Sequence, residues 1–469
     1  MKNITSLSVS ELSLLLQRRQ ISSFELTQAY LDNIEQNRTL NAFITVCDEN
    51  VLEMARRSDE RRSKGDAVHS LDGIPFAVKD NLCTSGIRTT CASKMLADFV
   101  PPYTATAVSR LLSVGGILIG KTNMDEFGMG SHSQNSFFGG VKNPLNTKLS
   151  PGGSSGGSAV AVAAKLAPYA LGTDTGGSVR LPAAYCGVVG MKPTYGAISR
   201  YGLIAFASSL DHVGIISDDI STNAYVLDVI KGKDKFDSTS LSFDASVYPY
   251  DVQNPKGIRI GVPTLTDVSD EVRAAVESAT AIFEKAGAKI STVTLPPDNA
   301  LVSAYYVISA AEASSNLARY DGVRYGYRAE DTRSIDELFI SSRTEAFGDE
   351  VKRRILLGTY CLSEGSKQKY YQKAIEARQK ISCELSRLLS ECDVILSPVS
   401  AENAPMIEDI PSSPIDVYRR DAFTVAANLS GLPAISVPSG KSAVQLIGNR
   451  FSEGLLYSLG SILTGEVTP

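Results

Sequence analysis

The chain reads Ser150-Pro-Gly-Gly-Ser-Ser-Gly-Gly-Ser158 at its most unusual point, and Gly172-Thr-Asp-Thr-Gly-Gly-Ser-Val-Arg180 follows shortly after. An Ala/Val run separates these two glycine-serine stretches. Glycines beside a helix start allow the backbone to turn tightly and to present its N–H groups. A flexible linker has a similar composition, but it would not lead straight into apolar residues that must be buried. The stretches therefore predict backbone turns inside a folded core.

Two known glycine-rich motifs can be compared with the first stretch. A phosphate-binding loop requires Lys where Ser158 stands, so that motif does not match. A nucleophile elbow, G-x-S-x-G, fits residues 153–157 and would make Ser155 the nucleophile. It also needs a downstream histidine, and His212 follows too closely to leave room for the strands of such a fold. The elbow is therefore a disfavoured alternative.

The composition of the 469 residues excludes several classes of protein. Hydrophobic residues make up 43% and charged residues 21%, which excludes disorder, collagen-like repeats and coiled coils. The net charge of −5 provides no positive field for nucleic acid or anionic membrane. Seven cysteines without a C-x-x-C pair favour reduced thiols in the cytoplasm, and three histidines offer few metal ligands. The most apolar run, residues 159–171, is too short to span a bilayer. We expect no metal and no membrane segment.

The secondary-structure patterns predict an α/β protein. Capping boxes at Ser8–Glu11 and Ser22–Glu25 predict two N-terminal helices. Residues 257–296 predict a β-α-β unit whose helix, 271–286, is capped by Ser269. Apolar runs predict strands at 74–78, 116–119, 188–191, 258–262, 289–295, 394–396, 434–437 and 443–447. We predict one domain over residues 1–469, with N-terminal helices in residues 1–60 and a mostly helical insertion at 300–390.

The two glycine-serine stretches, with a lysine roughly 75 residues before the first serine pair, resemble the amidase signature family. Lys79 ends the strand-like segment 73–80, Ser154 lies in the first stretch and Ser178 in the second. The resemblance implies a large mixed β-sheet core covered by helices on both faces. It also implies that Ser178 is the nucleophile, and that Ser154, which follows a cis peptide bond in the family, relays the proton between Ser178 and Lys79.

This chemistry requires a neutral lysine. A serine hydroxyl must lose its proton to a base as it attacks, and the pKa of lysine must fall by roughly three units before it can serve as that base. Burial beside the apolar strand would lower the pKa of Lys79, and Asp80 should face the other way along the strand. Attack on an amide creates an oxyanion, which backbone N–H groups of the second stretch can face. Those N–H groups belong to Thr175, Gly176, Gly177 and Ser178. For Ser155, Asp174, Arg180 and His132 we expect structural roles.

Within the family, segments 124–130, 312–326 and 351–359 are similar to the glutaminase subunits of the aspartyl/glutamyl-tRNA amidotransferases. Such subunits hydrolyse glutamine and pass ammonia to a partner subunit. The partner amidates Glu or Asp on a mischarged tRNA with ATP and Mg²⁺. The resemblance implies a chain without a cofactor of its own, in a heterotrimer with two other subunits, B and C. The net charge of −5 predicts that the tRNA is held mainly by the partner subunit. A free-standing amidase for another small amide and a non-catalytic scaffold are the alternatives.

Glutamine is a zwitterion, so its pocket needs a cation for the α-carboxylate and a carboxylate for the α-ammonium group. By the resemblance, the cation falls in segment 351–355, where we choose Arg354 over Arg353, and the carboxylate is Asp421. Tyr305 or Tyr306 would cover the pocket. One departure from the family occurs after Gly440, where a longer turn is usual. Here the next strand follows at once, so either this loop is short or residues are absent from it.

Overall fold

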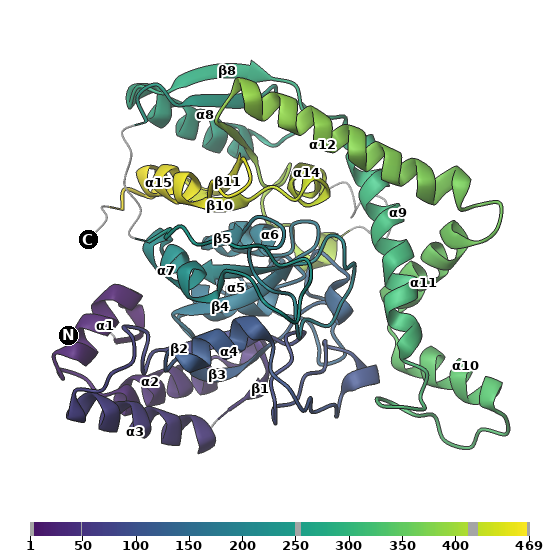
Figure 1. The fold of residues 1–469 in the computed structure, drawn as a ribbon, viewed down its shortest axis with the longest axis horizontal. Helices are drawn as coiled ribbons and strands as arrows, with labels where there is room; N and C mark the ends of the chain where they lie inside the picture. The colour runs from purple at the N-terminus through teal and green to yellow at the C-terminus, as the bar shows by residue number, and fades with distance from the viewer. Residues whose placement is uncertain (1–3, 48, 249–254, 411–420, 467–469) are drawn as a thin grey trace.

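An eleven-stranded mixed sheet forms the centre of the computed structural model, which describes residues 4–47, 49–248, 255–410 and 421–466 (Figure 1). The strands lie in the order β1-β3-β2-β4-β6-β5-β10-β11-β9-β7-β8. Strand β2 is parallel to β3 and β4, strand β7 is parallel to β8 and β9, and the other neighbours are antiparallel. The strands are β1 (Phe43–Val46), β2 (Pro75–Lys79), β3 (Ile117–Thr122), β4 (Tyr169–Asp174), β5 (Val189–Lys192), β6 (His212–Ser217), β7 (Arg259–Pro263), β8 (Lys289–Val293), β9 (Val394–Pro398), β10 (Ala434–Ser439) and β11 (Ser442–Gly448).

Helices cover both faces of the central strands. Strands β2, β3, β4, β6 and β9 are buried at every residue. Successive side chains point to opposite faces of a sheet, so a strand buried throughout must be covered on both sides. The helices are α1 (Val9–Gln17), α2 (Ser23–Gln36), α3 (Glu49–Lys64), α4 (Thr106–Ser113), α5 (Gly156–Ala163), α6 (Arg180–Cys186), α7 (Ile220–Ile230), α8 (Asp270–Lys285), α9 (Asp298–Asn316), α10 (Ile335–Ala346), α11 (Asp349–Leu362), α12 (Lys373–Glu391), α14 (Ala422–Ser430) and α15 (Glu453–Thr464). The predicted fold class is confirmed.

Helix caps form where the sequence predicts them. In α1 the Ser8 hydroxyl accepts the Glu11 N–H while the Glu11 carboxylate accepts the Ser8 N–H, and α2 repeats this capping box. The Ser269 hydroxyl caps α8, and β7 and β8 pair in parallel on either side of that helix in the chain. The predicted β-α-β unit is therefore confirmed.

Helices α9 to α12 occupy the region of the predicted helical insertion and extend along one side of the sheet (Figure 1). Helix α11 packs against α9, and α9 and α12 pack against α14. One apolar cluster contains residues of these helices and of β9 and β10, among them Leu385, Ile395 and Ala434. The insertion therefore shares its core with the sheet. No helix in the described ranges is long and apolar enough to cross a bilayer.

Three strands were not predicted from the sequence, namely β1, β4 and β6. Strand β4, Tyr-Ala-Leu-Gly-Thr-Asp, lies near the middle of the sheet and is buried at every position. A strand buried on both faces shows no alternation of polar and apolar residues, and Gly, Thr and Asp within it reduce its apolar character. This strand contains the first three residues of the second glycine-serine stretch, so it places Thr175 to Ser178 directly after its end.

Candidate active site

Lys79 ends β2 and is fully buried. Its Nζ lies 2.8 Å from Ser154 Oγ, 2.9 Å from Ser155 Oγ and 2.8 Å from Thr173 Oγ1. Burial lowers the pKa of Lys79 to about 7, although the carboxylates of Asp125, Asp174 and Asp211 act to raise it. Burial therefore favours the neutral amine, which a base at this position would require.

The three hydroxyl partners of Lys79 are not equivalent. A neutral amine has two N–H donors and one lone pair, so one of the three hydroxyls must donate to it. The Ser155 hydroxyl donates instead to the Thr173 carbonyl, at 3.1 Å. Ser154 and Thr173 are thus the hydroxyls that can give a proton to the Lys79 nitrogen.

The first glycine-serine stretch forms a tight turn that ends at the start of α5. The peptide bond between Gly153 and Ser154 is cis. A Cβ at Gly153 would overlap the Asp125 carboxylate, so only glycine fits this turn. The Asp125 N–H donates to the Ser154 carbonyl at 3.2 Å, and the Asp125 carboxylate accepts the Ser133 N–H at 2.9 Å. The loop that begins at Asp125 therefore holds Ser154 beside Lys79.

Ser178 lies between β4 and α6 and is 8% exposed, whereas Lys79 is fully enclosed. The Ser155 N–H donates to the Ser178 carbonyl at 3.1 Å, which joins the two glycine-serine stretches. The Ser178 hydroxyl has no hydrogen bond to any residue that the structure describes. The structure thus brings Lys79 and Ser154 into contact, and it leaves the expected contact between Ser154 and Ser178 unformed.

The turn from Thr175 to Ser178 presents fewer N–H groups than predicted. The Gly177 N–H donates to the Asp174 carboxylate at 2.8 Å, so it is already engaged. A Cβ at Gly176 would lie 2.5 Å from the Tyr305 ring, so the turn approaches that ring closely. Among the residues that the structure describes, none accepts the N–H groups of Thr175, Gly176 and Ser178.

A buried ion pair between Arg180 and Asp174 stabilises this turn. The Arg180 guanidinium contacts the Asp174 carboxylate at 3.0 and 3.1 Å and also bonds to Asn428 and Gln445. Burial alone would raise the pKa of Asp174, but the positive charge of Arg180 holds it below its usual range. Asp174 is therefore an anion that fixes the turn, in agreement with the structural role expected for it.

Three of the predicted glutamine-binding side chains meet in one buried group. The guanidinium carbon of Arg354, on α11, lies 4.3 Å from the centre of the Tyr306 ring, and the Tyr306 hydroxyl donates to Asp421 Oδ2 at 2.6 Å. Arg354 is 3% exposed. The side chain of Arg353 is 47% exposed, and both arginines pair with Glu350 of the same helix. The structure therefore places Arg354, and not Arg353, against the tyrosine that bonds to Asp421.

Ser131 belongs to the same group, although the sequence did not single it out. Its hydroxyl donates to Asp421 Oδ1 at 3.1 Å. Burial raises the pKa of Asp421 to about 6, while the Tyr306 and Ser131 hydroxyls and Arg354 lower it. Tyr305, whose ring packs edge-to-face against Tyr306, borders Gly176. A cation and a carboxylate thus lie next to the turn that carries Ser178.

Neither His132 nor His212 forms a catalytic triad with a serine of the two glycine-serine stretches. His132 Nδ1 lies 3.0 Å from Ser150 Oγ, which fits the loop role expected for it. His212 contacts Lys192 Nζ and the Leu210 carbonyl. Ser155, the nucleophile of the elbow hypothesis, bonds to Lys79 and Thr173 instead. In the described ranges, no three His, Cys, Asp or Glu side chains gather in a way that could hold a metal ion.

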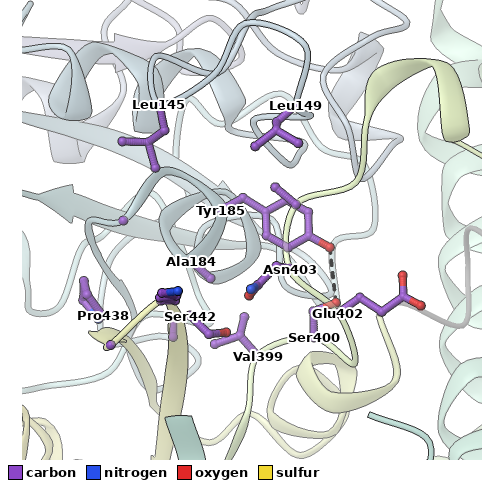
Figure 2. Close-up of a pocket in the computed structure, with 15 residues that line it drawn as sticks. Leu145, Leu149, Ala184, Tyr185, Val399, Ser400, Glu402, Asn403, Pro438 and Ser442 are labelled. Atoms are coloured by element: carbon purple, nitrogen blue, oxygen red, sulfur yellow. Dashed lines mark hydrogen bonds between the residues drawn. The ribbon is translucent and has the colours of Figure 1, made fainter. Parts of the chain in front are cut away.

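A separate cavity of about 400 Å³ is lined in part by Ala184 and Tyr185 of helix α6 (Figure 2). Tyr185, whose hydroxyl lies 3.2 Å from Ser400 Oγ, and the β10–β11 turn are parts of its wall. In that turn Ser439 pairs with Ser442, so only Gly440 and Lys441 connect the strands. The loop at this departure from the family pattern is therefore a two-residue hairpin. None of the predicted site residues lines this cavity.

Comparisons with known proteins bear on the family and the fold of the chain. The amidase family model matches residues 25–457. The A subunit of glutamyl-tRNA(Gln) amidotransferase from Caldanaerobacter subterraneus is 47% identical over 97% of this chain and 95% of its own length. The A subunit of the same enzyme from Nitrosococcus oceani is 48% identical over 96% of this chain and 95% of its own length. The crystal structure of the same subunit from Thermotoga maritima aligns with a TM-score of 0.81 and 38% identity, over 98% of this chain and 95% of its own. The peptide amidase of Stenotrophomonas maltophilia aligns with a TM-score of 0.83 and 28% identity, over 98% of this chain and 96% of its own.

Proposed function

The chain belongs to the amidase family, and we propose that it is the glutamine-hydrolysing subunit of a tRNA-dependent amidotransferase. One observation carries the proposal. A lysine whose pKa burial lowers to about 7 contacts Ser154, and a buried Arg354–Tyr306–Asp421 group lies beside the turn that bears Ser178. The lysine and its serine partner suit the cleavage of an amide, and the Arg354–Tyr306–Asp421 group suits the two charged groups of glutamine.

In the proposed reaction, Ser178 Oγ bonds to the side-chain amide carbon of glutamine. The Ser178 proton passes to Ser154 and from Ser154 to the neutral Lys79 amine. The oxyanion that forms accepts hydrogen bonds from the free N–H groups of the turn. Lys79, now protonated, returns the proton through Ser154 to the leaving nitrogen, and ammonia departs. Water then attacks the ester on Ser178, and glutamate is released.

Two charged contacts would select glutamine among amides. The Arg354 guanidinium binds the α-carboxylate, and Asp421 binds the α-ammonium group. Burial raises the pKa of Asp421 to about 6, so at neutral pH its carboxylate is ionised. Tyr306 and Ser131 hold that carboxylate in place, and Tyr305 lies between the charged group and Gly176. An amide that lacks either charge would forfeit one of these contacts.

We further propose that ammonia passes to a partner subunit, which converts Glu-tRNA(Gln), Asp-tRNA(Asn) or both with ATP and Mg²⁺. The assembly is a heterotrimer with two other subunits, B and C, in the cytoplasm. The names of the relatives and the free thiols of all seven cysteines support this arrangement. Because a net charge of −5 gives this chain no positive field, the partner subunit binds most of the tRNA.

A free-standing amidase is the second candidate, because the peptide amidase aligns as well as the amidotransferase subunit does. Glutamate release from glutamine should be compared with hydrolysis of neutral primary amides of the same length. The proposal expects kcat/KM for glutamine to be about 100-fold higher, since two charged contacts are lost with a neutral amide. A preference for the neutral amides would favour the second candidate.

A further inference from the structure

Glu126 is a buried carboxylate that the proposed reaction does not use. Its side chain is 3% exposed and lies in the loop that follows β3. The Ser93 hydroxyl donates to Oε1 at 2.5 Å, and the Gly348 N–H donates to Oε2 at 2.9 Å. A buried carboxylate is costly unless it is hydrogen-bonded, so this side chain is held in one geometry by partners from distant parts of the chain.

The contact with Gly348 joins the sheet core to the helix that carries Arg354. Gly348 is the N-cap residue of α11, and Arg354 follows about 9 Å further along the helix axis. A Cβ at Gly348 would overlap Glu126 Oε2, so the approach depends on glycine. Next to Glu126, the Phe127 ring packs against Phe347 at 5.7 Å between ring centres. Glu126 therefore lies at the junction where the loop after β3 meets the start of α11.

The same loop also contacts the catalytic turn. Asp125 donates its N–H to the Ser154 carbonyl at 3.2 Å, and the Glu126 N–H donates to Asn135 Oδ1 at 2.8 Å. Two consecutive residues thus contact the two halves of the proposed site. Asp125 holds Ser154, and Glu126 holds the first turn of α11.

We infer that Glu126 is a positioning residue, which fixes the Arg354 helix relative to Ser154 and so sets the binding of the glutamine α-carboxylate. This inference rests on the proposed function. If the start of α11 shifts, the guanidinium of Arg354 moves with it, whereas Lys79 and Ser154 keep their own contacts. Loss of Glu126 should therefore weaken the binding of substrates that carry an α-carboxylate and leave other amides almost unaffected.

The test uses the assembled enzyme with two substrates, glutamine and 4-aminobutanamide, which is glutamine without its α-carboxylate. Glu126→Ala should raise KM for glutamine by about tenfold, with kcat changed less than about threefold. Its kcat/KM for 4-aminobutanamide should stay within about twofold of wild type. Glu126→Gln should restore KM, since the amide oxygen can accept the Gly348 N–H and the amide nitrogen can donate to Ser93.

Two further variants separate positioning from general damage. Gly348→Ala places a methyl group too close to Glu126 Oε2 and must displace that carboxylate, so it should reproduce the KM change of Glu126→Ala. Asp349→Ala removes a carboxylate from the same helix start, but that side chain is 90% exposed, so its KM should match wild type. In an Arg354→Ala background, Glu126→Ala should add no further change in KM, because both act on one contact.

Several outcomes would overturn the inference. Equal losses with glutamine and 4-aminobutanamide in Glu126→Ala and Gly348→Ala would mean that Glu126 serves stability alone. Failure of Glu126→Gln to restore KM would mean that the charge, and not the geometry, is what matters. Additive KM changes in the Arg354→Ala background would place Glu126 on a different contact. A wild-type assembly that cleaves 4-aminobutanamide but not glutamine would instead overturn the proposed function, and the inference with it.

Discussion

At the level of single residues, Lys79 combines full burial with three hydroxyl groups within 2.9 Å of its nitrogen. Burial favours the neutral amine, and the hydroxyls can donate to that amine or accept from it. The resemblance to the amidase family picked out this lysine, and its place at the end of an apolar run predicted its burial. Its third partner, Thr173, could not be predicted, since it lies in β4, a strand that the sequence pattern did not reveal.

We expect kcat/KM for glutamine to rise with pH through about 7 and then to level off. Burial lowers the pKa of Lys79 to about 7, and the base acts only in its neutral form, present above that pH. A pH–rate profile of the assembled enzyme measures this. Lys79→Arg should be inactive at every pH, because arginine stays protonated. An active arginine variant, or a flat profile between pH 6 and 9, would contradict the role of Lys79 as the base.

Arg354 and Arg353 offer a matched pair, since they are adjacent in α11 and differ in burial. Arg354→Ala should raise KM for glutamine and lower kcat/KM by roughly 30- to 1000-fold, the effect of losing a partly buried charge-assisted pair. Arg353→Ala should leave kcat/KM within about threefold of wild type, as an exposed ion pair contributes little. Steady-state kinetics on both variants decide the assignment. Equal effects would show that Arg354 does not bind the substrate.

At the level of elements, the two glycine-serine stretches build the site because they connect to buried strands and helices. The first leads into α5, and the second joins β4 to α6. Their contiguous motifs carry the resemblance to the amidase family, and that resemblance picked out Ser154 and Ser178. The contact between Ser131 and Asp421 could not be, because 290 positions separate the two residues and folding alone brings them together. The engaged N–H of Gly177 likewise follows from the position of Asp174 after β4.

The close approach of Gly176 to Tyr305 can be tested with one methyl group. A Cβ at Gly176 would lie 2.5 Å from the Tyr305 ring, so Gly176→Ala must displace either the ring or the turn. We expect kcat/KM to fall about 100-fold or more, as after the loss of an oxyanion donor. Gly454→Ala is the control, since a Cβ there meets nothing within 4 Å. Unchanged activity in Gly176→Ala would remove this turn from the oxyanion site.

At the level of the whole molecule, one continuous sheet extends from β1 to β8, and the helices α9 to α12 share a core with its β9–β10 side (Figure 1). The proposed site lies where these parts meet, with Lys79 and the serines from the sheet side and Arg354 from α11. The α/β class could be predicted from the alternation of strands and helices. The strand order could not, because sequence patterns do not specify which strands pair.

The charge of the whole chain gives a further expectation. With a net charge of −5, the isolated chain should bind tRNA about 100-fold more weakly than the full assembly at physiological salt. Fluorescence anisotropy with labelled tRNA, repeated at several salt concentrations, measures both affinities. An isolated chain that binds tRNA as tightly as the assembly would contradict the proposal that the partner holds the tRNA.

The most direct test of the proposed function compares two nitrogen donors in the reconstituted assembly carrying Ser178→Ala. With glutamine, formation of amidated tRNA should fall at least about 1000-fold, since the nucleophile is absent. With ammonium chloride, it should stay within about twofold of wild type, because ammonia enters after the serine site. If glutamine-driven amidation persisted, or if both donors failed equally, then Ser178 would not be the residue that releases ammonia from glutamine.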